Sequence, residues 1–216
     1  MCFSAGASFA GGAVITAIGV LTISTNQDHS RRLFAAIPLI FGVQQISEGF
    51  VWVALQSPGH DLMLSISMYI FLIAALVIWP SVIPLSVLSM EKVKGRRLVL
   101  YFFLVVGLLT SAYYGLSLLV NDVEPRIISH HIKYAPVYPR PMSLLIFIAY
   151  LIATLTPLFI SSVRKMWIFG LLVTASCFIT GIFFKEFLAS VWCFFAALIS
   201  AVIWLIVRRE RLKEKV

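Results

Sequence analysis

The chain has 216 residues, of which 61% are hydrophobic and only 12% are charged, and its mean hydropathy is +1.00. Soluble domains are about 45–50% apolar and about 25% charged, so this composition excludes an ordinary soluble domain and predicts a protein dissolved in a lipid bilayer. The formal net charge of +8 would suggest a nucleic-acid partner in a soluble protein. In a membrane protein the same charge is explained by orientation in the bilayer, so we expect no nucleic acid.

The apolar stretches predict a single all-α domain over residues 1–216, a polytopic integral membrane protein with seven transmembrane helices. Each stretch has about 20 residues or more, enough to cross roughly 30 Å of hydrocarbon at about 1.5 Å per residue. The predicted helices cover about 3–24, 33–56, 62–90, 98–120, 142–161, 166–184 and 187–207. The first is expected to be retained, because no basic segment precedes it and no cleavage site is evident.

Local signals add detail to two of these helices and to the C-terminal tail. Ser4, Ser8, Gly12 and Thr16 recur every fourth residue and predict a face for close helix packing. Trp79-Pro80 and Pro84 predict a kink in the third helix, because proline removes a ladder hydrogen bond. The charged tail after residue 207 is expected to fray.

The basic residues predict which way the chain crosses the membrane, because Lys and Arg accumulate in short cytoplasmic loops. With seven helices, only four of the 17 Lys and Arg residues fall on one side: Arg126, Lys133, Arg140 and Lys185. The other side, which includes the C-terminal tail, holds the rest. We therefore expect the N-terminus outside, the C-terminus in the cytoplasm, and anionic lipid as a further contact for the basic tail.

Glu48 is the only Asp, Glu, Lys or Arg inside a predicted membrane helix. A carboxylate at the middle of such a helix costs on the order of 3 kcal/mol, so it needs a partner or a water-filled pocket. Glu48 lies about eight residues from the outer end of its helix, or roughly 12 Å below the outer surface. The outer halves of the helices also collect most of the Ser, Thr and Tyr residues, which predicts a polar pocket that opens outward.

The preferred hypothesis is that this pocket binds a small polar ligand or cation, for transport or for sensing. Glu48 would supply charge and Trp52 would form a wall of the pocket. Gln44 and Gln45 would orient the carboxylate, and Tyr113 or Tyr114 would donate hydrogen bonds. A structural glutamate that is hydrogen-bonded inside the bundle stays open as the alternative.

Two other classes of function also remain open, so the sequence does not decide whether the protein is an enzyme. Cys2, Glu48, His60 and His130 are the candidate ligands of a zinc or copper ion in a membrane-embedded, metal-dependent hydrolase. That site would require two loops to converge, and the sequence has no HExxH or CxxC spacing. The third class is a non-catalytic assembly factor, and homo-oligomerisation is open in each case.

Two motifs resemble an uncharacterised family of bacterial multi-pass membrane proteins. They are Met1-Cys-Phe-Ser-Ala5, which precedes a Gly- and Ala-rich helix, and Gln44-Gln-x-x-Glu-Gly-x-x-Trp52 in the second helix. The resemblance implies the bacterial inner membrane and a working end formed by the N-terminus and the second helix, but it names no reaction. Zinc-dependent ceramidase-like amidases also look similar in topology. They are disfavoured, because their paired histidines are missing from the predicted last helix, and a retinal protein is disfavoured because that helix has no lysine.

Overall fold

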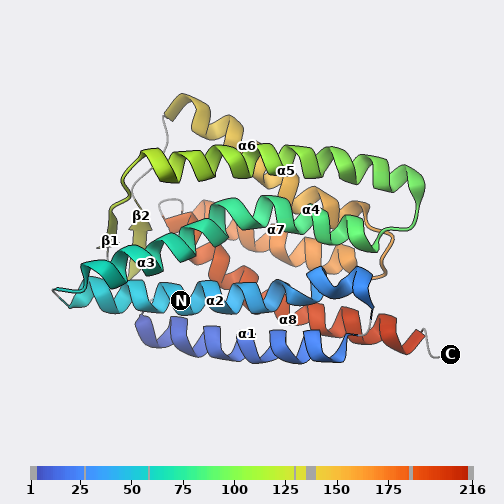
Figure 1. The fold of residues 1–216 in the computed structure, drawn as a ribbon, viewed down its shortest axis with the longest axis horizontal. Coiled ribbons are helices and arrows are strands. Elements are labelled where there is room, and N and C mark those ends of the chain that lie inside the picture. The colour runs from blue at the N-terminus through green and yellow to red at the C-terminus, as the bar shows by residue number, and fades with distance from the viewer. Residues whose placement is uncertain are drawn as a thin grey trace.

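The computed structural model describes residues 4–26, 28–57, 59–128, 130–134, 140–184 and 187–213, which form an elongated bundle of helices (Figure 1). The helices are α1 (Ala5–Thr25), α2 (Arg32–Gln56), α3 (Asp61–Leu72), α4 (Trp79–Met90), α5 (Lys94–Val120), α6 (Arg140–Ile160), α7 (Met166–Phe183) and α8 (Leu188–Lys213). A 3-10 turn, His29–Arg31, precedes α2, and a π-helical segment, Ile73–Ile78, joins α3 to α4. We call Ile73–Ile78 the π segment.

The described residues include six helices that are long and apolar enough to cross a membrane. The stretch Asp61–Met90 counts as one of them, because α3, the π segment and α4 are continuous. The prediction of an all-α membrane protein is therefore confirmed. Helix α6 has a shorter apolar part, Leu144–Ile160. Helix α8 continues to Lys213, so the tail predicted to fray is helical up to that point, as suits its content of Arg, Lys, Glu and Leu.

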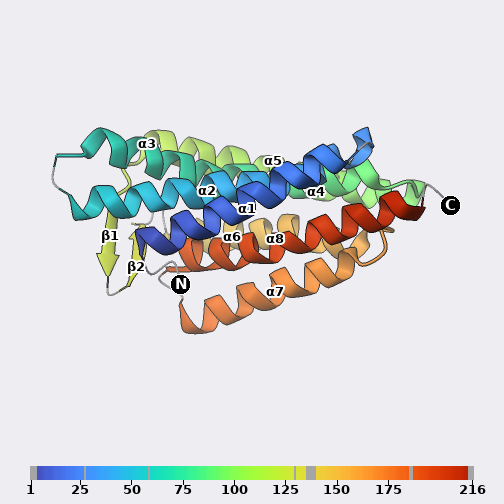
Figure 2. The same cartoon turned by 90° about the horizontal axis from the view of Figure 1, so that it is seen from below.

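Helix α2 is surrounded by other helices of the bundle. It packs against α1, α3, α4 and α8, and Figure 2 shows α1 and α8 together on one side of it. Phe34, Ala35, Ile37 and Val51 are fully buried along its length. Because so many neighbours surround α2, polar side chains on most of its faces are enclosed.

Small residues bring α1 and α2 into close contact. Ser8 and Gly12, two members of the predicted packing face, are buried on α1. A Cβ atom on Gly12 would lie 3.0 Å from the backbone nitrogen of Ile46, and one on Gly42 would collide with Thr16. The interface therefore depends on residues without large side chains, as in other membrane helix pairs.

The π segment follows from the prolines of α4. The N–H of Trp79 bonds to the carbonyl of Ala74, five residues earlier, and the next donor in this register would be Pro80, which has no N–H. The carbonyl of Ala75 instead accepts a hydrogen bond from the Tyr150 hydroxyl of α6, at 2.7 Å. Where the sequence predicted a kink, at Trp79-Pro80, the structure thus has a π-helical segment. The Ala75 carbonyl that this segment leaves without a backbone donor is paired with the Tyr150 hydroxyl of α6.

Replacing Tyr150 with phenylalanine tests this account. The change keeps the buried ring but leaves the Ala75 carbonyl without its donor, which we expect to cost about 2 kcal/mol. The midpoint of thermal unfolding in detergent measures the loss. Tyr101→Phe is the control, because Tyr101 is 48% exposed. An unchanged midpoint for Tyr150→Phe would show that water or backbone adjustment replaces the hydroxyl.

A β-hairpin in the connection between α5 and α6 covers the end of the bundle at which α2 ends (Figure 1). Strand β1 (Pro125–Ile128) pairs antiparallel with β2 (His131–Tyr134), with Ile128 opposite His131. Ile132 is fully buried in one apolar cluster with Val51 and Trp52. The sequence had given no sign of these strands, since the connection is rich in proline.

Candidate functional site

Four of the predicted site residues lie on one buried stretch of α2. Gln44, Gln45 and Glu48 have no exposed surface, and Trp52 is 2% exposed. Gln44, Glu48 and Trp52 recur at intervals of four residues, so their side chains follow one side of the helix. Gln45 is one position further round. We call Gln44, Gln45 and Glu48 the polar cluster.

Two side chains from other helices meet the polar cluster. The indole N–H of Trp79 donates a hydrogen bond of 2.8 Å to Oε1 of Gln44. The Cys193 thiol of α8 lies against the Gln44 amide and interacts electrostatically with Glu48. The polar cluster therefore lies where α2, α4 and α8 meet.

Several polar atoms around this point have no hydrogen-bond partner within the described part of the chain. They are both amide atoms of Gln45 and the indole nitrogens of Trp52 and Trp192. Leaving such a group unpaired in an apolar interior costs about 1–3 kcal/mol by mutational data. In native proteins buried polar groups of this kind are usually satisfied by water or a bound ligand.

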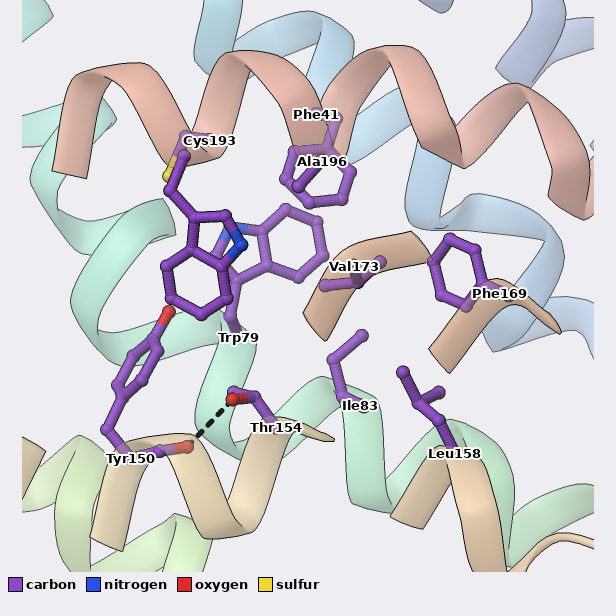
Figure 3. Close-up of a pocket in the computed structure, with 11 residues that line it drawn as sticks. Phe41, Trp79, Ile83, Tyr150, Thr154, Leu158, Phe169, Val173, Cys193 and Ala196 are labelled. Carbon is purple, nitrogen blue, oxygen red and sulfur yellow. Dashed lines mark hydrogen bonds between the residues drawn. The ribbon is translucent and has the colours of Figure 1, made fainter. Parts of the chain in front are cut away.

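A cavity of about 40 Å³ lies beside the polar cluster, between α2, α4, α6, α7 and α8 (Figure 3). Trp79 and Cys193 line it and also contact Gln44, so they connect the cavity to the cluster. The other lining residues are Phe41, Ile83, Tyr150, Thr154, Leu158, Phe169, Val173, Trp192 and Ala196. A cavity of this size has room for a few water-sized species, because one water needs about 10–15 Å³ by the same measure.

Aromatic side chains form a large part of the cavity wall, since five of its eleven lining residues carry a ring. Phe41 stacks on Trp79 with ring centroids 3.9 Å apart, and Tyr150 meets Trp192 edge to face at 5.9 Å. The face of an aromatic ring is electronegative, so a small cation in this cavity would be attracted to the rings as well as to Glu48. The hydroxyl of Thr154 donates to the Tyr150 carbonyl at 2.8 Å and adds no free donor.

The remaining predicted ligand-binding residues lie elsewhere. Helix α5 packs chiefly against α4, α6 and the π segment, and there Tyr114 meets the ring of Tyr150 edge to face at 6.2 Å. Tyr113 is half-buried beside Tyr114. Glu48 itself is fully buried, and the hairpin and α8 pack against α2. The outward opening of the pocket stays a prediction.

The candidate metal ligands do not converge where the structure describes them. His60 and His130 are exposed, whereas Glu48 is fully buried. Among the described residues no group of three His, Cys, Asp or Glu side chains is placed to hold a metal ion. Cys2, the fourth predicted ligand, lies outside the described residues. The structure therefore does not bring Glu48, His60 and His130 together, and the role of Cys2 stays a prediction.

Sequence reasoning missed the contribution of Trp79, Tyr150, Trp192 and Cys193. Trp79 was noticed only as the residue before Pro80, and the other three residues had no role in the predicted site. An available signal was the pairing of two glutamines with a glutamate inside one apolar helix, which requires donors from neighbouring helices. Which helices provide those donors depends on tertiary packing.

The helices and the enclosed polar cluster define a multi-pass helical membrane protein with a buried ionisable site. The chain belongs to the DUF6629 family, a family of unknown function whose model matches residues 1–216. No curated protein and no solved structure matches the chain.

Proposed function

We propose that the protein binds a small polar ligand or cation at the polar cluster of α2, as part of transport or sensing. One observation carries the proposal: Gln45 is fully buried, and both of its amide atoms lack a hydrogen-bond partner within the described chain. Glu48, also fully buried, follows three residues later on the same helix. Intramembrane ionisable residues of this kind are functional by default, because burying them is otherwise unfavourable.

The cavity favours a small cation over a larger ligand. Its volume of about 40 Å³ accepts an ion of the size of water, and aromatic rings line it. Glu48 would supply the compensating negative charge, and Gln44 and Gln45 would supply neutral oxygens and donors. Na⁺, K⁺ and ammonium meet these limits, whereas a drug-sized ligand does not.

The proposal includes a topology of seven spans, with the N-terminus outside and the C-terminus in the cytoplasm of a bacterium. Helix α6 has 21 residues, about 32 Å at 1.5 Å per residue, which supports its role as the seventh span. The α1–α2, α4–α5 and α6–α7 connections lie with the C-terminus at one end of the bundle (Figure 1). Together with the C-terminal tail and the adjoining helix ends, these connections carry all but four of the 17 Lys and Arg residues, which supports a cytoplasmic assignment of that end in the inner membrane.

Thermal unfolding in the presence of single salts tests the binding function. Purified protein in neutral detergent is titrated with sodium, potassium or ammonium chloride, and choline chloride holds the ionic strength constant. We expect one of the three small cations to raise the unfolding midpoint in a saturable way, since a ligand at about 100 times its Kd stabilises by about 2.7 kcal/mol. Glu48→Gln should remove this response.

A second variant guards against a folding defect in Glu48→Gln. Gln45→Met keeps the approximate shape of the side chain, removes the unpaired amide, and is expected to weaken the cation response while preserving the folded bundle. The proposal is wrong if none of the three cations shifts the wild-type midpoint. It is equally wrong if both variants respond to the cation as the wild type does.

A further inference from the structure

A groove on the outer surface of the bundle runs between α1 and α8, far from the polar cluster. Its volume is about 430 Å³. Only apolar side chains line it: Ile18, Leu21, Ala201, Val202, Trp204 and Leu205. Leu21 is 56% exposed and Leu205 is 49% exposed, so the groove faces the surroundings of the bundle. In a membrane these surroundings are the acyl chains of lipids.

The groove becomes polar at one end on both of its sides. Helices α1 and α8 run in the same direction, and their C-terminal ends lie at the same end of the bundle (Figure 2). On α1, Ser24 and Thr25 follow Leu21 by about one turn. On α8, Arg208 follows Trp204 by four residues, and its guanidinium carbon lies 5.0 Å from the centroid of the Trp204 ring. The arrangement matches an amphipathic molecule with its polar group at the Arg208 end.

The charge at that end is positive. Arg208 is exposed, and its stacking on Trp204 leaves the guanidinium N–H groups at the edge of the groove. The sequence adds Arg209, Arg211 and Lys213 to the same end of α8, against one acidic residue, Glu210. Asp28, in the neighbouring α1–α2 connection, is already engaged with Arg31 at 3.3 Å. An anionic headgroup is therefore favoured.

We propose that the groove between α1 and α8 binds a phospholipid with a net anionic headgroup. One acyl chain lies along the apolar wall from Ile18 to Leu205, and the phosphate receives hydrogen bonds from Arg208. Arginine suits this role because its planar N–H groups can pair with two phosphate oxygens at once. A zwitterionic headgroup carries its own ammonium ion, which competes with Arg208 for the phosphate. This proposal is independent of the function assigned to the polar cluster.

The test compares two lipids with identical acyl chains, phosphatidylglycerol and phosphatidylcholine. The full chain in neutral detergent is titrated with each, and native mass spectrometry measures the bound fraction. We expect phosphatidylglycerol to bind more tightly than phosphatidylcholine. Arg208→Gln should weaken phosphatidylglycerol about fivefold, the effect of about one basic residue near an anionic lipid surface.

Two further variants separate this site from general attraction to basic surfaces. Arg96→Gln removes an exposed positive charge from the start of α5, outside the groove, and should bind phosphatidylglycerol as the wild type does. Ala201→Phe fills the groove and should weaken binding without altering any charge. Equal binding of the two lipids, equal effects of Arg208→Gln and Arg96→Gln, or full binding by Ala201→Phe would each overturn the proposal.

Discussion

Replacing Gly107 with alanine is expected to destabilise the bundle by about 3 kcal/mol, an unusually large effect for one added methyl group. A Cβ atom at this position would collide with the carbonyl oxygen of Pro80 and lie 2.8 Å from its carbonyl carbon. Both are backbone atoms of α4, so no side-chain rotation relieves the collision. Helices α4 and α5 would have to separate and lose contacts along their shared interface. The midpoint of thermal unfolding in detergent measures the effect.

Pro84 explains why α5 approaches α4 so closely at this point. Because Pro84 has no N–H, the carbonyl of Pro80 lacks its usual helical donor four residues later. Gly107 brings the backbone of α5 against this carbonyl, where a Cα–H group can make a weak contact. The methyl group added by Gly107→Ala would block this close approach.

Gly115→Ala is the matched control on the same helix. The nearest atom to a Cβ at Gly115 is Cγ2 of Val77 at 3.9 Å, an ordinary contact. Alanine is a better helix former than glycine by about 1 kcal/mol, so this variant should be as stable as the wild type or more stable. Equal midpoints for Gly107→Ala and Gly115→Ala would contradict the close approach of α5 to Pro80.

The same region shows what the sequence could and could not predict about the fold. Hydropathy located the membrane helices to within a few residues, because a stretch of about 20 apolar residues has few alternatives. Trp79-Pro80 and Pro84 predicted a kink in the third helix, and the structure has a π-helical segment immediately before them. The sequence could not predict that Tyr150 donates to Ala75 or that Gly107 opposes Pro80, because these contacts depend on how α4, α5 and α6 align.

The sequence likewise predicted some residues of the candidate site and not others. Glu48 stood out in the sequence because a charged residue inside an apolar helix is costly, and its neighbours Gln44 and Gln45 came with it. The partners Trp79 and Cys193 are 35 and 149 residues from Gln44 in the chain, and no local pattern links them to it. Proximity to the membrane surface suggested Tyr113 and Tyr114, but depth alone does not determine which helix faces α2.

Glu91 connects two loops at the basic end of the bundle, and its removal is expected to have the second large effect. Its side chain is almost fully buried where α4 ends. One carboxylate oxygen accepts the Ser162 N–H at 2.7 Å, and the other accepts the Ser162 hydroxyl at 2.7 Å and the Val93 N–H at 2.9 Å. The α4–α5 connection is thereby fixed to the α6–α7 connection, 71 residues further along the chain.

Glu91→Ala should lower the free energy of unfolding by about 3 kcal/mol, because it removes three hydrogen bonds that the almost fully buried Glu91 carboxylate accepts from Ser162 and Val93. The exposed Glu124 provides the control. It pairs with Arg126 at 2.8 Å, but both side chains are about two-thirds exposed or more, so Glu124→Ala should change stability by less than about 1 kcal/mol. Similar losses of unfolding free energy for the two variants would show that the hydrogen bonds of Glu91 stabilise the protein no more than an exposed ion pair does.

The stabilisation by Glu91 should also depend on pH. Burial raises the pKa of the Glu91 carboxyl, but hydrogen bonds from Val93, Ser162 and Lys92 outweigh burial, so the pKa is lowered overall. A lowered pKa in the folded protein means that the stabilisation is complete above the usual glutamate value of about 4.3 and is lost as the pH falls through the lowered value. We therefore expect the stability difference between the wild type and Glu91→Gln to be constant near neutral pH and to shrink below about pH 4. A difference that grew on acidification would mean that the folded protein prefers the protonated carboxyl, which the three donors around it argue against.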